Sequence, residues 1–294
     1  MTLRIRTPAK LNLGLEVLGR RPDGFHELAT IFQAVDVYDE LHLTPGAAFS
    51  YISDPDVPPE DDIARPILEG AAVELGWTSP LRLVKRIPIS AGLGGGSSDA
   101  ALAIRLRAAG LDRSPLIKEA ARIGADVPFF LHGGTTIATG IGSRLTPLPT
   151  PRLWFVVHTP DVYVERKTAM LFQGLESTDF TAGSTISEIA RILQTEPETF
   201  PDTLPNAFER QMLEIPVVAK ARRLLFDLAG RVALTGAGPS VYSWHHSPEK
   251  ARAIGSAMVD AAGGKTLVCA TIPEHDDQDE LVAFHRELVR GAPE

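Results

Sequence analysis

Cysteine is nearly absent from this chain of 294 residues, where Cys269 is the only one. A single cysteine excludes an internal disulfide framework and a cysteine-based zinc site, and such scarcity is typical of a reducing compartment. Long hydrophobic runs are absent as well. The longest uncharged stretch, 127–143, contains a proline, a histidine, three threonines and four glycines, so we do not expect it to span a membrane.

The first residues lack the apolar core of a secretory signal, because positions 2–8 alternate apolar and polar side chains. We therefore expect a soluble, cytoplasmic protein that does not bind membranes. Basic residues are also outnumbered: 29 Lys and Arg against 37 Asp and Glu give a net charge of −8. This balance argues against a nucleic-acid binder. It still allows a small anionic substrate in a locally positive pocket.

The chain has the composition of a globular protein, with 44% hydrophobic and 22% charged residues. Its length suits about two domains. The segment 144–152 carries three prolines and little periodicity, so we place the boundary there. The expected domains are 1–150 and 151–294.

Apolar periodicity switches repeatedly between strand and helix spacing, which favours an α/β or α+β class. In the first half we predict strands at 2–8, 11–18, 28–35, 40–44 and 81–89, and helices at 63–76, 97–110 and 115–123. Residues 8–10 are expected to join the first two strands. In the second half we predict strands at 153–158, 231–235, 240–244 and 265–271, and helices at 165–173, 184–194, 206–229, 248–262 and 278–290.

A glycine-rich loop, GLGGGSSD over 92–99, lies between a predicted strand and a predicted helix. Glycine lets the backbone adopt positive φ and approach a ligand closely. The first amides of the following helix are free donors at the positive end of its dipole, so the loop predicts a phosphate site. It lacks the lysine of the Walker pattern and the third glycine of the dinucleotide pattern. The simpler alternative is a flexible turn capped by serine. The role of Asp99 stays open between helix stabilisation and a metal-mediated contact.

Two further residues gain meaning beside a phosphate site. Lys10 alone would be an ordinary solvated lysine, and Asp126 alone would be a helix N-cap before an apolar segment. Phosphoryl transfer to an alcohol needs a carboxylate that accepts the hydroxyl proton and a cation that offsets charge. Lys10 and Asp126 are candidates for these roles. A further glycine motif, 234–240, is either a hairpin turn or a close backbone approach to a substrate.

Three segments in this order resemble the motifs of the GHMP small-molecule kinases, which include galactokinase, homoserine kinase and mevalonate kinase: PAKLNLGLEV, GLGGGSSDAA and LTGAGPSVY. Within that superfamily, PAKLNLGLEVLGRRPDGFHEL and GADVPFFLHGG most resemble kinases of the non-mevalonate route to isoprenoid (terpenoid) precursors. The resemblance covers nearly the whole chain. It implies a two-domain α+β fold, with an N-terminal ATP domain like domain 2 of ribosomal protein S5 and a ferredoxin-like C-terminal domain that completes the substrate cleft.

The resemblance implies transfer of the ATP γ-phosphate, with Mg²⁺, to the 2-hydroxyl of a cytidylated sugar alcohol. Lys10 and Asp126 are the implied catalytic pair. The implied ATP loop comprises Pro88, Ile89, Ser90, Ala91, Gly92, Leu93, Gly94, Gly95, Gly96, Ser97 and Ser98, and Ser98 is a candidate magnesium ligand. The implied substrate contacts are Asn12 at a polar position facing the substrate, Phe25 and His26 at the cytosine, Tyr163 over its other face, and Gly236 and Gly238.

Two other functions remain open at this point. One is another GHMP kinase, acting on homoserine or on a mevalonate-type alcohol. The DGFH segment, 23–26, and the lack of further basic clusters near the motifs argue against it. The other is a nucleotide-binding module without catalysis, which would retain the glycine loop but need neither Lys10 nor Asp126.

Overall fold

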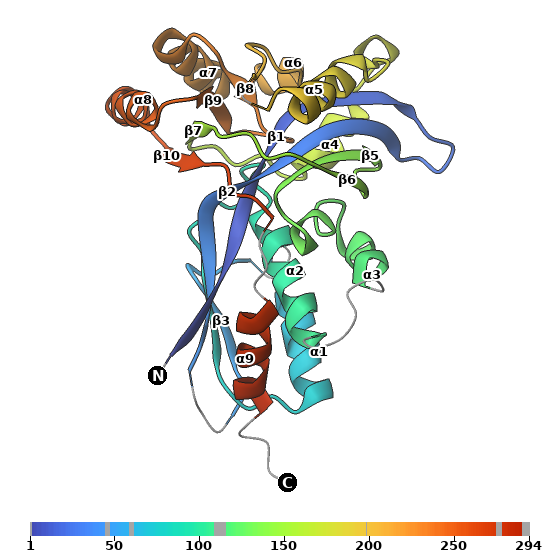
Figure 1. Cartoon of the computed structure of the whole chain (residues 1–294), viewed down its shortest axis with the longest axis vertical. Helices are drawn as coiled ribbons and strands as arrows, with labels where there is room; N and C mark the ends of the chain where they lie inside the picture. The colour runs from blue at the N-terminus through green and yellow to red at the C-terminus, as the bar shows by residue number, and fades with distance from the viewer. Residues whose placement is uncertain are drawn as a thin grey trace.

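Two β-sheets with helices packed against them form the molecule (Figure 1). The structure is a computed structural model that describes residues 2–44, 48–58, 62–108, 116–197, 199–274 and 278–289. The six-stranded sheet has the order β3-β4-β2-β5-β6, with β1 paired to β2, and the four-stranded sheet has the order β10-β7-β9-β8. The expected α+β class is confirmed.

The strands of the first sheet are β1 (Leu3–Arg20), β2 (His26–Leu43), β3 (Tyr51–Asp54), β4 (Leu81–Val84), β5 (Thr135–Gly140) and β6 (Arg144–Leu148). Those of the second are β7 (Trp154–Thr159), β8 (Ala233–Leu234), β9 (Val241–His245) and β10 (Lys265–Ala270). The helices are α1 (Arg65–Leu75), α2 (Gly95–Arg107), α3 (Leu116–Ile123), α4 (Lys167–Gln173), α5 (Ser184–Thr195), α6 (Glu209–Met212), α7 (Pro216–Ala229), α8 (Pro248–Ala261) and α9 (Gln278–Val289). The described residues also form two 3₁₀ turns, η1 (Phe129–Leu131) and η2 (Ser177–Asp179).

The antiparallel pair of long strands β1 and β2 joins the two parts of the molecule. The predicted break at residues 8–10 is wrong, because β1 continues through Pro8 with a register shift between Pro8 and Ala9. A bulge bends a strand without ending it. The middle of the pair packs against the second sheet, where Leu11 of β1 meets Phe155 of β7 and Tyr242 of β9 in one buried cluster. The first motif therefore runs along the contact between the sheets.

Helix α9, from the end of the chain, packs against the first half. Its Leu281 and Phe284 are buried in a cluster with Leu102 of α2 and Leu68 of α1, and the three helices lie together in Figure 1. The segment expected to contain the domain boundary begins as strand β6, paired with β5. The boundary near residue 150 stays a prediction. Positions 109–110, 115 and 290, which the predicted helices include, lie outside the described residues.

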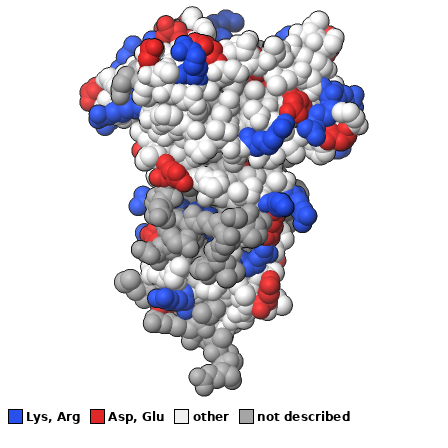
Figure 2. All heavy atoms as spheres, turned by 45° about the vertical axis from the view of Figure 1, so that its right-hand side comes forward, with Lys and Arg blue, Asp and Glu red and all other residues white. Residues whose placement is uncertain are grey.

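Helices α7 and α8 pack beside the second sheet. The single helix predicted over 206–229 is divided into α6 and α7, because Pro216 begins a new helix at its first turn. None of the described helices has the length and apolar character needed to cross a membrane. On the face in Figure 2, basic and acidic side chains are interspersed, so this face presents no single large patch of one sign.

Candidate active site

A cavity of about 650 Å³ lies where the two halves meet. Its lining comes from β1, β2, the segment 87–97, residues Ala125 and Asp126 before η1, helix α4 and the third glycine motif, residues 234–240. Of the residues singled out in the sequence, those that line it are Lys10, Asn12, Pro88, Ile89, Ser90, Ala91, Gly92, Gly94, Gly95, Gly96, Ser97, Asp99, Asp126, Tyr163 and Gly236. The remaining five do not: Phe25, His26, Leu93, Ser98 and Gly238.

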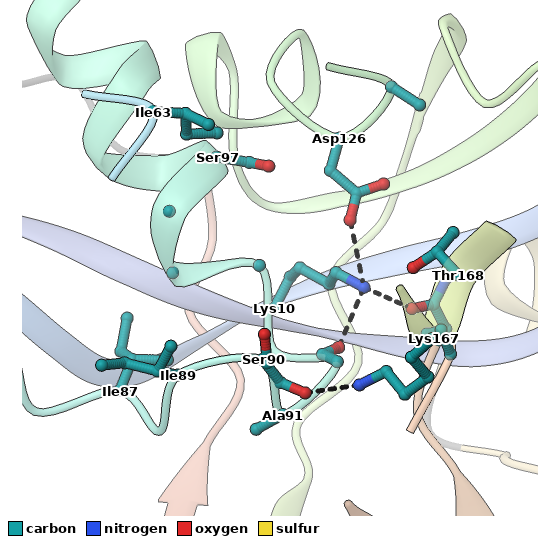
Figure 3. Close-up of a pocket in the computed structure, with 18 of the residues that line it drawn as sticks. Lys10, Ile63, Ile87, Ile89, Ser90, Ala91, Ser97, Asp126, Lys167 and Thr168 are labelled. Carbon is teal, nitrogen blue, oxygen red and sulfur yellow. Dashed lines mark hydrogen bonds and ion pairs between the residues drawn. The ribbon is translucent and has the colours of Figure 1, made fainter. Parts of the chain in front are cut away.

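Lys10 and Asp126 face each other across this cavity although 116 positions separate them in the chain. The Lys10 Nζ lies 3.3 Å from the Asp126 Oδ2, and Figure 3 shows the carboxylate directed at the ammonium. Lys10 is only 3% exposed, whereas Asp126 is 31% exposed and open to the cavity. A buried cation next to an accessible carboxylate suits proton transfer from a bound hydroxyl.

Asn12 fixes the position of Lys10. The Lys10 ammonium donates to the Asn12 Oδ1 at 2.6 Å and to the Gly92 carbonyl at 3.1 Å. The Asn12 side-chain amide in turn donates to the Thr30 Oγ1 at 2.8 Å, and the Thr30 hydroxyl donates to the Gly14 carbonyl. Both ends of the Asn12 side chain are therefore occupied by protein groups. This arrangement favours orientation of Lys10 over the direct substrate contact that the resemblance implied.

The glycine loop leads into α2 as the strand–loop–helix pattern predicted. Gly94 precedes the helix with φ of +72°, and a Cβ there would lie 2.9 Å from the Phe130 ring. The Ser98 amide donates to the Gly94 carbonyl, so the amides before it lie in the first turn, where a helix provides no acceptor. The Ser98 hydroxyl is buried and has no hydrogen-bond partner among the described residues.

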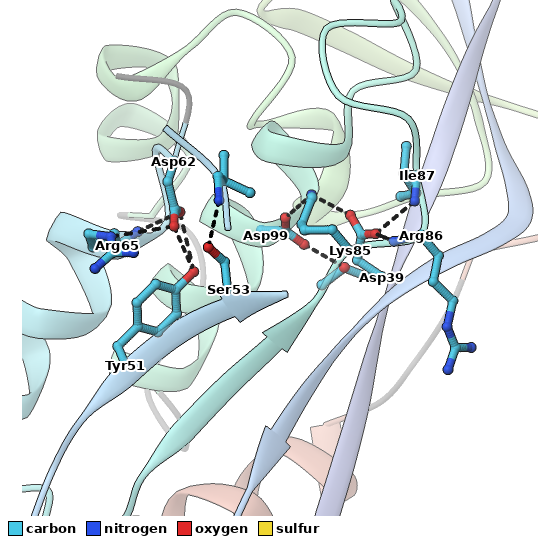
Figure 4. A network of polar contacts seen from close by, with 11 residues as sticks. Asp39, Tyr51, Ser53, Asp62, Arg65, Lys85, Arg86, Ile87 and Asp99 are labelled. Carbon is cyan, nitrogen blue, oxygen red and sulfur yellow. Dashed lines mark hydrogen bonds and ion pairs between the residues drawn. The ribbon is translucent and has the colours of Figure 1, made fainter. Parts of the chain in front are cut away.

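Asp99 belongs to a buried network below this loop (Figure 4). The Lys85 ammonium contacts both Asp39 and Asp99, and the Thr7 hydroxyl donates to Asp99 at 2.7 Å. Burial raises the pKa of Asp99, and the neighbouring Lys85 ammonium opposes that change. Asp39 also accepts the backbone amides of Arg86 and Ile87. The network therefore connects the strand before the glycine loop to the helix after it.

Lys167, which the sequence patterns did not indicate, also lines the cavity. Its ammonium donates to the backbone carbonyls of Ser90 and Gly238. Burial lowers the pKa of Lys167 to about 8, and the nearby charge of Lys10 acts in the same direction. A cation at the first position of a helix opposes the helix dipole. That local conflict is the signal in this segment that indicates a role outside helix stability.

The predicted cytosine contacts are only partly brought together. Phe25 is 61% exposed, whereas His26 stacks on Phe172 with ring centroids 5.0 Å apart. Phe172 lines the cavity and makes an edge contact with Phe208, which also lines it. Tyr163 lines the cavity but is 69% exposed. The sequence patterns did not indicate Phe172, because an aromatic residue at helical spacing is usually part of the core.

Comparisons with known proteins agree on the type of enzyme. The family model described as GHMP kinases N terminal domain matches residues 64–134. A 4-diphosphocytidyl-2-C-methyl-D-erythritol kinase of Methylococcus capsulatus is 38% identical over 268 residues, covering 86% of each chain. One from Burkholderia thailandensis is 36% identical over 286 residues, covering 91% of this chain and 93% of the relative.

Solved structures give the same result. A crystal structure of 4-(cytidine 5'-diphospho)-2C-methyl-D-erythritol kinase matches with a TM-score of 0.74 and 31% identity, over 92% of this chain and 99% of that one. A homoserine kinase from Cytophaga hutchinsonii has a TM-score of 0.67 at 19% identity, over 93% and 95% of the two chains. The second likeness concerns the fold alone.

Proposed function

Because the chain belongs to the 4-diphosphocytidyl-2-C-methyl-D-erythritol kinase family of the GHMP kinases, we propose that it phosphorylates this cytidylated alcohol at its 2-hydroxyl with ATP. This reaction serves the non-mevalonate route to isoprenoid precursors. The observation that carries the proposal is the Lys10–Asp126 pair, which faces a cavity that also contains the start of α2. A module that only bound nucleotide would need no such pair.

The nucleotide is expected to bind along the glycine loop. Amides of the first turn of α2 and its dipole would contact the phosphates. The cavity lining includes apolar side chains that suit a purine ring: Val57, Ile63, Leu83, Ile87 and Ile89. The γ-phosphate would then extend towards Lys10 and Asp126.

The transfer step uses the carboxylate as the proton acceptor. Asp126 takes the proton of the substrate hydroxyl while the hydroxyl oxygen forms a bond to the γ-phosphorus. The bond from that phosphorus to the bridging oxygen of ADP breaks, and ADP leaves. Lys10 stabilises the Asp126 carboxylate and the negative charge on the transferred group. Asn12 and the Gly92 carbonyl keep Lys10 in place during the step.

The residues present also fit a magnesium ion. Mg²⁺ prefers oxygen ligands and is usually held by one or two carboxylates together with substrate phosphates. The unpartnered Ser98 hydroxyl and the open Asp126 carboxylate offer such oxygens. No cluster of three acidic or histidine side chains that could bind a metal occurs among the described residues. When bound, the ion would neutralise phosphate charge; we propose Ser98 as its protein ligand.

The cytosine is expected at the aromatic side of the cavity. Phe172 offers a ring that lines the cavity, and His26 stacks on that ring from β2. We propose Phe172 as the main stacking residue. Phe25, which precedes His26 in the chain, and Tyr163, nine residues before Phe172, are the more exposed candidates.

An ADP-release assay with a panel of alcohols tests the proposal. The panel contains the cytidylated methylerythritol, the same alcohol without cytidylate, homoserine and mevalonate. Turnover is expected with the cytidylated alcohol alone. Turnover of homoserine or mevalonate without the cytidylated alcohol would overturn the substrate assignment. ATP binding without turnover of any alcohol would favour the non-catalytic module.

A further inference from the structure

The nucleotide loop, residues 88–98, and the third glycine motif, residues 234–240, touch at the edge of the cavity. A Cβ on Gly92 would lie 2.4 Å from the Thr235 carbonyl oxygen and 3.0 Å from that of Gly238. The Thr235 hydroxyl donates to the Gly92 carbonyl, and the Ser240 amide donates to the Ala91 carbonyl. These segments come from different halves of the chain. The distance between the nucleotide loop and the third glycine motif therefore sets the shape of the cavity next to Lys10.

Lys167 spans this contact from a third segment, the start of α4. Its ammonium donates to the Ser90 carbonyl in the nucleotide loop and to the Gly238 carbonyl in the third motif. Figure 3 shows the side chain approaching Ser90. Ser90 is one of the non-glycine residues with positive φ, at +53°, a conformation that L-residues rarely adopt. The Lys167 hydrogen bond helps to hold the loop in this strained form.

We propose that Lys167 is a positioning residue for phosphoryl transfer: it fixes the nucleotide loop against the third glycine motif, so that bound phosphates face Lys10 and Asp126. The inference rests on the proposed function for its catalytic consequence. The structural part, that one lysine holds two loops together, can be tested without turnover. Lys167 thus acts through the two loops and not through contact with the reacting atoms.

The charge around Lys167 makes this contact sensitive to pH. The cavity also contains Lys10 and Asp126, which pair with each other, and Arg166, the preceding residue of the same segment. The other charged side chains of the lining are engaged in the networks of Figure 4: Asp62, Lys85 and Asp99. The acceptors of the Lys167 ammonium are thus neutral carbonyls. Since burial lowers its pKa to about 8, the ammonium is lost as pH rises through that value.

The test compares Lys167→Met with Lys167→Arg and with Lys220→Met, a control on the exposed face of α7. Hydrogen exchange is measured on residues 90–94 and 234–240, together with kinetics from pH 6.5 to 9.5. In Lys167→Met we expect faster exchange in both segments and a fall in kcat/KM for ATP of about tenfold or more. Arginine keeps its positive charge over this pH range. In Lys167→Arg we therefore expect hydrogen exchange as slow as in the unmodified protein, without the decline in activity above pH 8 that loss of the Lys167 charge causes. Lys220→Met should match the unmodified protein.

Two results would overturn the inference. If hydrogen exchange in Lys167→Met is unchanged and its kcat/KM stays within about threefold of that of the unmodified protein, Lys167 does not connect the two loops. Lost activity with unchanged exchange would mean that Lys167 acts directly on the phosphates instead of positioning loops. If the unmodified protein phosphorylates no alcohol, the proposed function fails, while the exchange data still decide whether Lys167 connects the loops. Circular dichroism verifies that each variant is folded.

Discussion

Three of the seven lysines of the chain line one cavity in a protein whose net charge is −8. Each has different partners: Lys10 pairs with Asp126, Lys85 with two buried aspartates, and Lys167 with backbone carbonyls. A locally positive pocket in an acidic protein is therefore built from individually fixed cations. Because all three are mostly buried, surrounding salt screens them less than it would screen surface charges.

Asp126 should be required for the chemical step and not for nucleotide binding. Asp126→Asn keeps the shape of the side chain but removes the proton acceptor, so kcat should fall by about a hundredfold or more. ATP affinity, measured by titration, should change by less than about threefold. Asp227→Asn on the exposed face of α7 is the control. Full activity of Asp126→Asn would remove Asp126 from the mechanism.

Phe172 should contribute more to substrate binding than Tyr163. Loss of base stacking costs roughly 1–3 kcal/mol, so Phe172→Ala should raise the Kd of the cytidylated alcohol by about 5–150-fold. Tyr163→Ala, at a side chain that is 69% exposed, should have a smaller effect. Calorimetric titration of each variant with the alcohol, and separately with ATP, measures both. A larger loss in Tyr163→Ala would restore Tyr163 as the main stacking residue.

His245 should make stability depend on pH. Its side chain is 3% exposed and its Nε2 lies 2.9 Å from the Ser243 Oγ. Burial lowers the pKa of His245 to about 4, with Lys250 and Arg231 adding to the effect. The unfolded chain, with a histidine pKa of about 6.5, binds the proton first. The free energy of unfolding should therefore fall between pH 6.5 and 4.

His245→Gln removes this group and should flatten that decline. Urea unfolding at several pH values in this range measures the slope for both proteins. His246→Gln is the matched control because His246 is exposed at the neighbouring position. An equal slope in His245→Gln and the unmodified protein would contradict the assignment.

Elements whose signals are local were predicted well, and elements that depend on a distant partner were not. Helices α1, α5 and α8 begin and end within a few residues of their predicted bounds, because apolar spacing and a terminal glycine or proline mark them. Strands β5 and β6 were missed. Their residues include Gly140 and Pro147, which do not favour strands, and it is the ladder with β2 that makes β5 a strand.

The contact between the two glycine motifs gives a prediction at the same scale. Gly92→Ala and Gly76→Ala both place a side chain at positive φ, which costs roughly 1 kcal/mol. Only Gly92 also meets backbone, since nothing lies within 4 Å of a Cβ on Gly76. ATP affinity should therefore fall by about tenfold or more in Gly92→Ala alone. Thermal unfolding of both variants measures the strain at positive φ, and titration with ATP measures the additional effect of the backbone clash at Gly92. Equal ATP affinities of the two variants would show that the glycine motifs can move apart without loss of ATP binding.

At the scale of the molecule, the sequence indicated that Lys10 and Asp126 lie together, but not which residues surround them. Lys10 and Asp126 stand in recognisable motifs, so the motifs alone were enough to predict that the two side chains meet. Lys167 and Phe172 have roles that arise only when α4 folds against the nucleotide loop and β2. The cation at the start of α4 is a local signal for Lys167, but no local pattern indicates which segments these two side chains contact. From the sequence we expected a domain boundary near residue 150. Nothing in the sequence indicated that α9 would pack on α1 and α2.

That packing predicts a single cooperative unfolding unit. Strand β1 contributes Ile5, Leu11 and Leu15 to three different buried clusters, and one of these also contains α9. Phe284→Ala should lower the free energy of unfolding by roughly 3–5 kcal/mol. Strand β9 and helix α9 belong to different clusters, but β1 connects these clusters. Native-state hydrogen exchange should therefore show the same loss of stability in α2 and in β9. Val259→Ala, at an exposed position of α8, should change both by less than about 0.5 kcal/mol. If β9 kept its full protection while α2 lost it, the two halves would be independent units, and the cavity between them would depend on contacts such as that of Lys167 to stay assembled.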